Sequence, residues 1–139
     1  MITGLEHIAF AVEKLDDAIP LWLLITGGAM SHREIVAEQQ VEVAVITIGD
    51  LHIELLCPLS PDSPTAKFLR NRGAGIHHVA LRAESAGDEM ARLKAAGLQF
   101  IDERVRDGAN QTHICFLHPR SAGGVLVEFV ESSSRVAFP

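Results

Sequence analysis

The stretch Gly75-Ile76-His77-His78-Val79-Ala80-Leu81 decides the fold, because Gly4-Leu5-Glu6-His7-Ile8-Ala9-Phe10 repeats its pattern 71 positions earlier. A second matching pair follows the two copies, Ile53-Glu54-Leu55-Leu56 after the first and Val127-Glu128-Phe129-Val130 after the second. A self-similar period of this length indicates a duplicated structural unit. The sequence therefore predicts two related halves, each with one histidine and one glutamate on its strands.

Composition limits the classes of protein that the chain can represent. At 139 residues it fits a single domain, 1–139, that can bury about two-thirds of its unfolded surface. The net charge of −6 gives no basic face for nucleic acid, although a few local cations could still hold an anionic small molecule. There is no charged leader and no apolar run near 18 residues, and Cys57 and Cys115 lie in apolar segments. We expect a reduced, cytoplasmic protein with no membrane partner.

Side-chain alternation and turn signals predict the order β-α-β-β-β in each half. In the first half the predicted elements are strand 4–12, helix 16–26 and strands 30–37, 40–48 and 51–57. In the second half they are strand 75–83, helix 85–96 and strands 98–105, 112–117 and 124–131. Pro20 should kink the first helix or mark its true start. The tail 132–139 shows no periodicity.

Between the halves, residues 58–74 read as a linker that contains a short helix, 64–72, capped by Ser63. Two βαβββ modules, about 4–57 and 75–131, then build an α+β fold. We expect an eight-stranded mixed, curved sheet with helices on one face and a metal cleft on the other. Small residues such as Ala9 and Ala80 fall on the predicted cleft side, and bulky ones such as Phe10 fall on the helix side.

Period-two geometry places four side chains on the predicted cleft face: His7, Glu54, His78 and Glu128. Taken singly, each is typical of a structural residue. As a duplicated pair they form a set of two nitrogen and two oxygen ligands that suits a divalent ion such as Co, Mn, Ni, Fe, Zn or Mg. Two buried carboxylates in an apolar sheet also favour a cation, because an unpaired buried charge costs several kcal/mol.

Two further histidines compete for a role at this site. His77 is the rival of His78, but the alignment of His7 with His78 in the repeat favours His78 as ligand and sends His77 toward the helix side. His52 shares a face with Glu54 and could be a substrate contact or proton carrier. It could equally be an exposed strand end.

At this point several segments resemble a known family. They are Glu38-Gln39, Ile53 to Leu56, Pro58 to Pro64, Gly75 to His78, Phe116 to Pro119 and Gly123 to Glu128. Over nearly the whole chain they are similar to the methylmalonyl-CoA epimerase family of the vicinal oxygen chelate superfamily, which has the glyoxalase fold. The resemblance implies metal ligands at His7, His78 and Glu128 with Gln or Glu at Glu54, an acyl-CoA substrate and a homodimer.

The sequence also departs from the family pattern. Some members carry a second active-site glutamate at the place of Val43, and the adjacent Glu42 should point the other way. The Gly-Ala-His-Gly loop of many members reads Gly108-Ala109-Asn110-Gln111 here, and the first helix lacks paired aromatic residues.

The resemblance implies interconversion of (R)- and (S)-methylmalonyl-CoA through an enolate, whose charge a divalent cation stabilises. Inversion needs a proton removed on one face of the carbon and returned on the other, so Glu54 and Glu128 are the natural pair of bases, with Glu128 the first choice. Lys67 and Arg120, with Arg70 and Arg72, are candidates for binding CoA, or are solvated surface charges. The alternatives are a glyoxalase I type lyase and a metal-free binding protein of the same superfamily.

Overall fold

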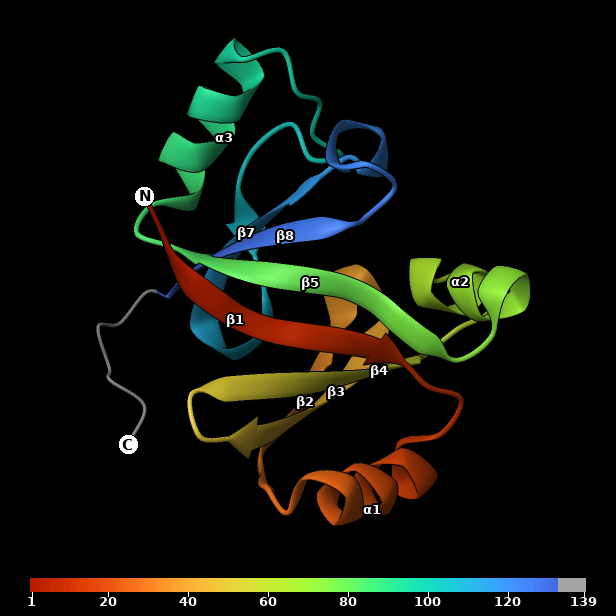
Figure 1. Ribbon diagram of the computed structural model, residues 1–139. Helices are drawn as coiled ribbons and strands as arrows, with labels where there is room; N and C mark the ends of the chain where they lie inside the picture. Colours follow the sequence, from red (N-terminus) through yellow and green to blue (C-terminus); the bar gives the residue numbers. More distant parts are fainter. Residues whose placement is uncertain (133–139) are drawn as a thin grey trace. The chain divides into compact units, whose positions relative to one another are not determined.

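The computed structural model describes residues 1–132, and it confirms an α+β fold built on an eight-stranded mixed sheet (Figure 1). The hydrogen-bonded order of the strands is β2-β3-β4-β1-β5-β8-β7-β6. β1 pairs with β4 and β5 pairs with β8 in parallel, while the pairs β2–β3, β3–β4, β6–β7 and β7–β8 are antiparallel. The chain divides into two compact units, one of residues His7–His78 and the other of Met1–Glu6 with the chain from Val79 on. Each unit therefore contains part of β1 and part of β5.

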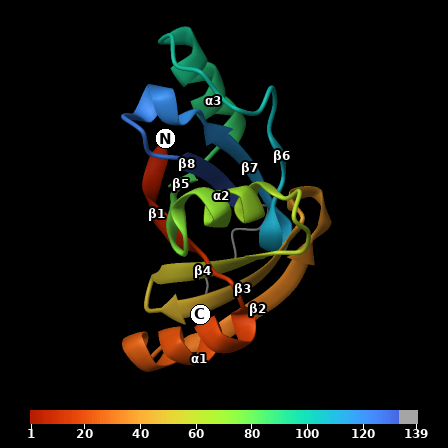
Figure 2. The same cartoon turned by 90° about the vertical axis from the view of Figure 1, so that its right-hand side faces the viewer.

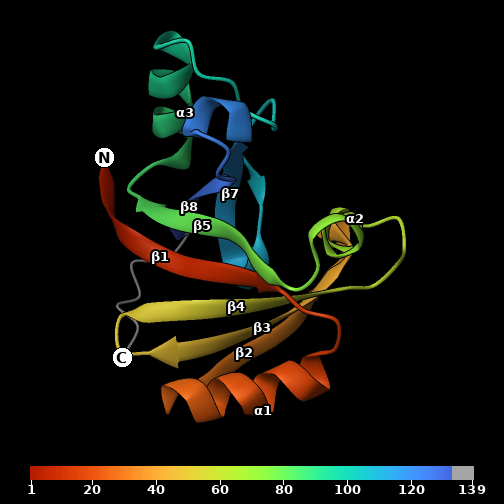
Figure 3. The same ribbon diagram turned by 45° about the vertical axis from the view of Figure 1, so that its right-hand side comes forward.

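The unit His7–His78 places one helix over one face of its strands. Its elements are α1 (Leu15–Thr26), β2 (Ala29–Val36), β3 (Val41–Ile48), β4 (Leu51–Pro58) and α2 (Pro64–Arg72), with β1 (Ile2–Ala11) from His7 on and β5 (Gly75–Ala83) up to His78. Helix α1 lies alongside β2, β3 and β4 (Figure 3). Its residues Leu15 and Ala18 pack with Ile46 and Leu55 on one face of the strands. The opposite face, which we call the site face, carries the buried residues Ala9, Val41, Val43, Val45 and Leu56.

Helix α1 begins at Leu15, so the prediction that Pro20 could mark its true start is wrong. Proline at this position removes the bond that its N–H would make to the carbonyl of Asp16. Asp16 is exposed, so water can bind that carbonyl, and burial of Leu15 and Ala18 holds the first turn in place. The helix ends as predicted at Gly27, which has a φ of 67° and donates its N–H to the carbonyl of Leu23.

The second unit also packs a helix on one face of its strands, but one of these strands, β6, has only two residues. It contains β5 from Val79 on, α3 (Ala86–Ala95), β6 (Arg106–Asp107), β7 (Thr112–Leu117) and β8 (Val127–Ser132), and α3 lies along β7 and β8 (Figure 2). Met90 of α3 packs with Cys115 and Phe129 on one face of the strands. The other face carries Ala80, Ile114, Phe116 and Val130.

The predicted strand 98–105 is wrong, because most of this segment does not enter the sheet. Its backbone starts a ladder with β7, where the N–H of Ile101 donates to the carbonyl of Phe116 at 2.9 Å and Phe100 bridges Leu117. The carboxylate of Asp102 then accepts from the N–H of Phe116 at 2.7 Å. A side chain thus takes the place of the next backbone carbonyl, and pairing resumes only at β6.

Helix caps follow the sequence closely. The Ser63 hydroxyl accepts from the N–H of Ala66 at the start of α2, and the Ser85 hydroxyl accepts from the N–H of Asp88 at the start of α3. The predicted irregular tail lies, from residue 133 on, outside the described residues, and Ser132 ends β8. The single-domain organisation with modules 4–57 and 75–131 and linker 58–74 stays a prediction. None of the helices within residues 1–132 is long and apolar enough to cross a membrane.

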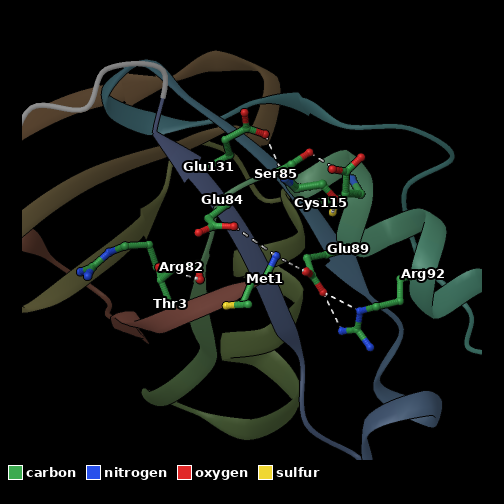
Figure 4. Close-up of polar contacts among 11 residues, drawn as sticks. Met1, Thr3, Arg82, Glu84, Ser85, Glu89, Arg92, Cys115 and Glu131 are labelled. Carbon is green, nitrogen blue, oxygen red and sulfur yellow. Dashed lines mark hydrogen bonds and ion pairs between the residues drawn. The ribbon is translucent and has the colours of Figure 1, made fainter.

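A buried carboxylate anchors the start of β1 in the second unit (Figure 4). Glu89 of α3 is 3% exposed and lies 2.8 Å from the amino group of Met1. Arg92 contacts the same carboxylate at 2.6 Å. Hydrogen bonding from the amino group, followed by that from Arg92, lowers the pKa of Glu89 below its ordinary value.

Candidate metal centre

Three of the four predicted ligands lie together in the unit His7–His78. The two Nε2 atoms of His7 and His78 are 3.2 Å apart, and the Nδ1 of His7 lies 2.9 Å from a carboxylate oxygen of Glu54. His7 and His78 are buried, and the Glu54 side chain is 14% exposed. Chain positions 7, 54 and 78 are thus brought into direct contact.

The strands explain why these side chains meet. In the parallel β1–β4 register His7 lies opposite His52 and Ala9 lies opposite Glu54, so alternation puts all four on the same face. Ala9 is fully buried, and its small side chain leaves room for the longer groups beside it. The prediction that alanines line this face of β1 while Phe10 packs toward α1 is confirmed.

His77 contacts helix α2, and it also contacts His78. Its ring packs on Phe68 of α2 with centroids 4.8 Å apart. Its Nδ1 lies 2.8 Å from the Nδ1 of His78. One chain of contacts therefore runs from Glu54 through His7 and His78 to His77. Within it the Nδ1 atom of each histidine has a partner, and the Nε2 atoms of His7 and His78 face each other.

This geometry fits a divalent ion. Zinc-type ions bind imidazole nitrogen at about 2.0–2.1 Å, so two such nitrogens lie about 2.8–3.0 Å apart at a right angle and about 3.3–3.4 Å apart at the tetrahedral angle. The observed Nε2 separation is 3.2 Å. Histidine ligands also bind their other ring nitrogen to a carboxylate or similar group, as His7 does with Glu54. The donor set suits an ion of borderline character.

Glu54 was predicted to bind the ion directly. Its contact with the Nδ1 of His7 instead favours a role in orienting that ring, since this nitrogen is the one that points away from His78.

Glu128 belongs to the second unit, where it is 6% exposed on β8. It lies opposite Ala80 of β5 and Phe116 of β7, on the face that α3 does not cover. Ala80 follows His78 by two positions along β5, so the two side chains share a side of that strand.

His52 is 7% exposed, so the interpretation as an exposed strand end is wrong. Val43 is buried and apolar on the site face. Glu42 points away from that face, as predicted, and accepts from Arg33 at 3.2 Å. The candidates for binding CoA lie at the surface, Lys67 on α2 and Arg120 in the 3-10 segment Pro119–Ala122.

Sequence reasoning missed one pair on the site face. His32 and Glu34 of β2 lie opposite Val45 and Val43 of β3, and the Nε2 of His32 is 3.0 Å from a carboxylate oxygen of Glu34. The spacing of two within a strand was a signal for this pair, but it does not by itself tell which face the pair occupies.

Comparison with known proteins identifies the family of the chain. The Glyoxalase/Bleomycin resistance protein/Dioxygenase superfamily matches residues 6–116. The human mitochondrial methylmalonyl-CoA epimerase is 35% identical, over 92% of this chain and 73% of its own length. The crystal structure of the Mycobacterium tuberculosis methylmalonyl-CoA epimerase superposes with a TM-score of 0.93 at 36% identity, covering 98% of this chain and 92% of that one. A methylmalonyl-CoA epimerase in complex with methylmalonyl-CoA and NH4+ gives 0.93 at 30% identity, over 96% and 97%.

Proposed function

Since the chain belongs to the methylmalonyl-CoA epimerase family, within the Glyoxalase/Bleomycin resistance protein/Dioxygenase superfamily, we propose that it interconverts (R)- and (S)-methylmalonyl-CoA. The reaction removes the proton on the carbon between the thioester and the carboxylate and returns it to the opposite face. The observation that carries the proposal is the facing pair of Nε2 atoms on His7 and His78, beside the carboxylate of Glu54.

We propose that His7, His78 and Glu128, each of which is buried and offers one ligand atom, hold a divalent ion. When bound, the ion supplies positive charge that stabilises the enolate left after proton removal. The candidate ions are Co, Mn, Ni, Fe, Zn and Mg.

The protein supplies orientation and proton transfer. Glu54 fixes the His7 ring through Nδ1, so that Nε2 stays directed toward His78. Glu128 is the first choice for the base that takes the α-proton, because its buried position on β8 keeps water away from the carboxylate. Ala9, Val43 and Val45 are buried on the site face and make its interior apolar.

For the CoA portion, Lys67 and Arg120 remain the proposed contacts with its phosphates. Both are exposed, as such a role requires. Reversing both charges should raise the KM for the CoA ester and leave kcat nearly unchanged. An unchanged KM would contradict the assignment.

Two further properties are proposed on the strength of the family. The protein forms a homodimer, which light scattering of the purified protein checks. It works in the cytoplasm with reduced thiols, and neither Cys57 nor Cys115 is in a disulfide.

The decisive experiment is exchange of the α-proton of methylmalonyl-CoA in heavy water. The metal-loaded protein should introduce deuterium and equilibrate the two epimers, and removal of metal with a chelator should abolish both. Isomerisation of a glutathione hemithioacetal without α-proton exchange of methylmalonyl-CoA would instead make the protein a glyoxalase I type lyase. Tight binding of small molecules with neither activity would make it a binding protein.

A further inference from the structure

The site face carries a second acid–base pair on β2, apart from the ligand cluster. His32 and Glu34 lie 3.0 Å apart, and each side chain is 32% exposed. A β-bulge between Met30 and His32 shifts the register of β2, and this shift turns both residues to the side of Val43 and Val45. The pair therefore shares a face with His7 and Glu54.

Register gives the spacing between the two groups. His32 lies opposite Val45, and Val45 lies opposite Glu54, so His32 and Glu54 occupy one row of the sheet, two strands apart. At about 4.7–4.9 Å per strand, their Cα atoms are about 10 Å apart. The apolar side chains of Val45, within this row, and of Val43, beside it, lie on the same face. A small acyl group bound between the ligand cluster and the His32–Glu34 pair would have one of them on each side.

The chemistry of the pair suits a proton donor. The Nε2 of His32 is buried and has no hydrogen-bond partner within the described part of the chain, so its 3.0 Å contact with Glu34 is electrostatic. An imidazole is the side chain that most often transfers protons in catalysis. His52, the other histidine of this face outside the cluster, is 7% exposed and less able to exchange its proton with solvent.

We infer that His32, held by Glu34, is the second proton-transfer group of the proposed epimerase. The first base takes the α-proton of one epimer, and the electron pair of the broken C–H bond remains as the enolate. The His32 imidazolium then delivers a proton to the opposite face, forming a new C–H bond, and becomes neutral. In the reverse direction neutral His32 takes the proton and the first base returns one. Substrate and product have the same composition, and both groups recover their protons through solvent.

This inference rests on the proposed function, so the test measures inversion and exchange separately. In heavy water His32→Gln should slow inversion by about 10²-fold to 10⁴-fold. Deuterium should still enter the epimer that the first base deprotonates, with retained configuration, so the ratio of exchange to inversion rises. Glu34→Gln should change the ratio in the same direction but less, because it removes only the orienting charge.

A matched control joins β2 to the neighbouring strand β3 on the opposite face. Arg33 and Glu42 form an ion pair of similar exposure, 38% and 29%, on the face toward α1. Glu42→Gln should leave the exchange-to-inversion ratio unchanged. Thermal unfolding of all three variants checks that the proteins are folded.

The outcomes are distinct. If His32→Gln behaves like Glu42→Gln, or if exchange and inversion fall by the same factor, His32 is not the second group, while the epimerase function stands. If the wild-type protein exchanges no α-proton at all, the proposed function fails, and this inference fails with it.

Discussion

Substitution of Glu54 tests how the metal centre is built. The carboxylate lies 2.9 Å from the Nδ1 of His7 and is 14% exposed, so the contact is largely shielded from water. A hydrogen bond to a charged group contributes about 1.5–3 kcal/mol. At 1.36 kcal/mol per decade, its loss in Glu54→Leu should weaken Co(II) binding about 10-fold to 100-fold, the usual range for a partner that orients a ligand. Glu54→Gln keeps an accepting oxygen and should cost less than about 10-fold.

A double-mutant cycle decides whether Glu54 acts through His7. Co(II) affinity is measured by calorimetry for His7→Ala, Glu54→Leu and the double variant. If Glu54 only orients His7, Glu54→Leu costs nothing further once His7 is alanine, and the coupling energy equals the whole loss seen in the single variant. Glu42→Gln, which removes a carboxylate on the other face, should leave the affinity unchanged.

One result would refute this reasoning. If Glu54→Leu costs the same affinity with and without His7, the carboxylate acts independently of that ring. Glu54 would then be a direct ligand of the ion, as the sequence pattern suggested.

Three further predictions address the base, acid stability and the thiols. Glu128→Gln should reduce turnover by about 10²-fold to 10⁴-fold in a steady-state assay run at saturating metal, and a near wild-type rate of α-proton exchange would eliminate Glu128 as the base. The pKa of Glu89 is lowered from 4.5, so the ionised carboxylate stabilises the fold above that pH, and the contribution is lost as pH falls through the lower folded value. Glu89→Gln should therefore lower the free energy of unfolding at pH 7, and this loss should become smaller as the pH falls below 4.5. Denaturant titrations that show a loss independent of pH would contradict this. Burial raises the pKa of Cys115 to about 12, so in the folded protein at pH 8 a disulfide reagent should react much more slowly with Cys115 than with the half-buried Cys57, and equal rates would contradict this.

Local signals in the sequence predicted most of the fold. The caps Ser63 and Ser85 and the stop at Gly27 act through contacts within a few residues, so they can be predicted from the chain alone. His7 and His78 could be identified from the sequence repeat, because the same residue pattern surrounds both. The strand prediction for 98–105 was wrong because Asp102 accepts a hydrogen bond from a backbone N–H 14 positions away. Side-chain alternation along the sequence does not reveal such a contact.

In the candidate site, too, local patterns were predicted correctly and features that depend on strand pairing were not. Alternation within β1 and β4 correctly placed His7 and Glu54 on one face. Counted from Ala29, which lies opposite Thr47, alternation along β2 would put Arg33 on the site face and His32 on the other. The bulge between Met30 and His32 reverses this parity, and it can be recognised only from the pairing with β3. Partners of ring nitrogens, such as His77 for His78, also depend on tertiary packing.

The two compact units divide within strands, between Glu6 and His7 and between His78 and Val79. A cut in the linker 58–74 would consequently yield two fragments, neither of which holds all the segments of a unit. One fragment would keep His7 and the other His78. Such fragments should be unstructured alone and should regain metal affinity only when mixed. The intact chain should unfold in one cooperative transition. Bound metal should raise the midpoint temperature of this transition in proportion to the logarithm of the free metal concentration. The reason is that His7 and His78 come together only when β1 and β5 are both in place.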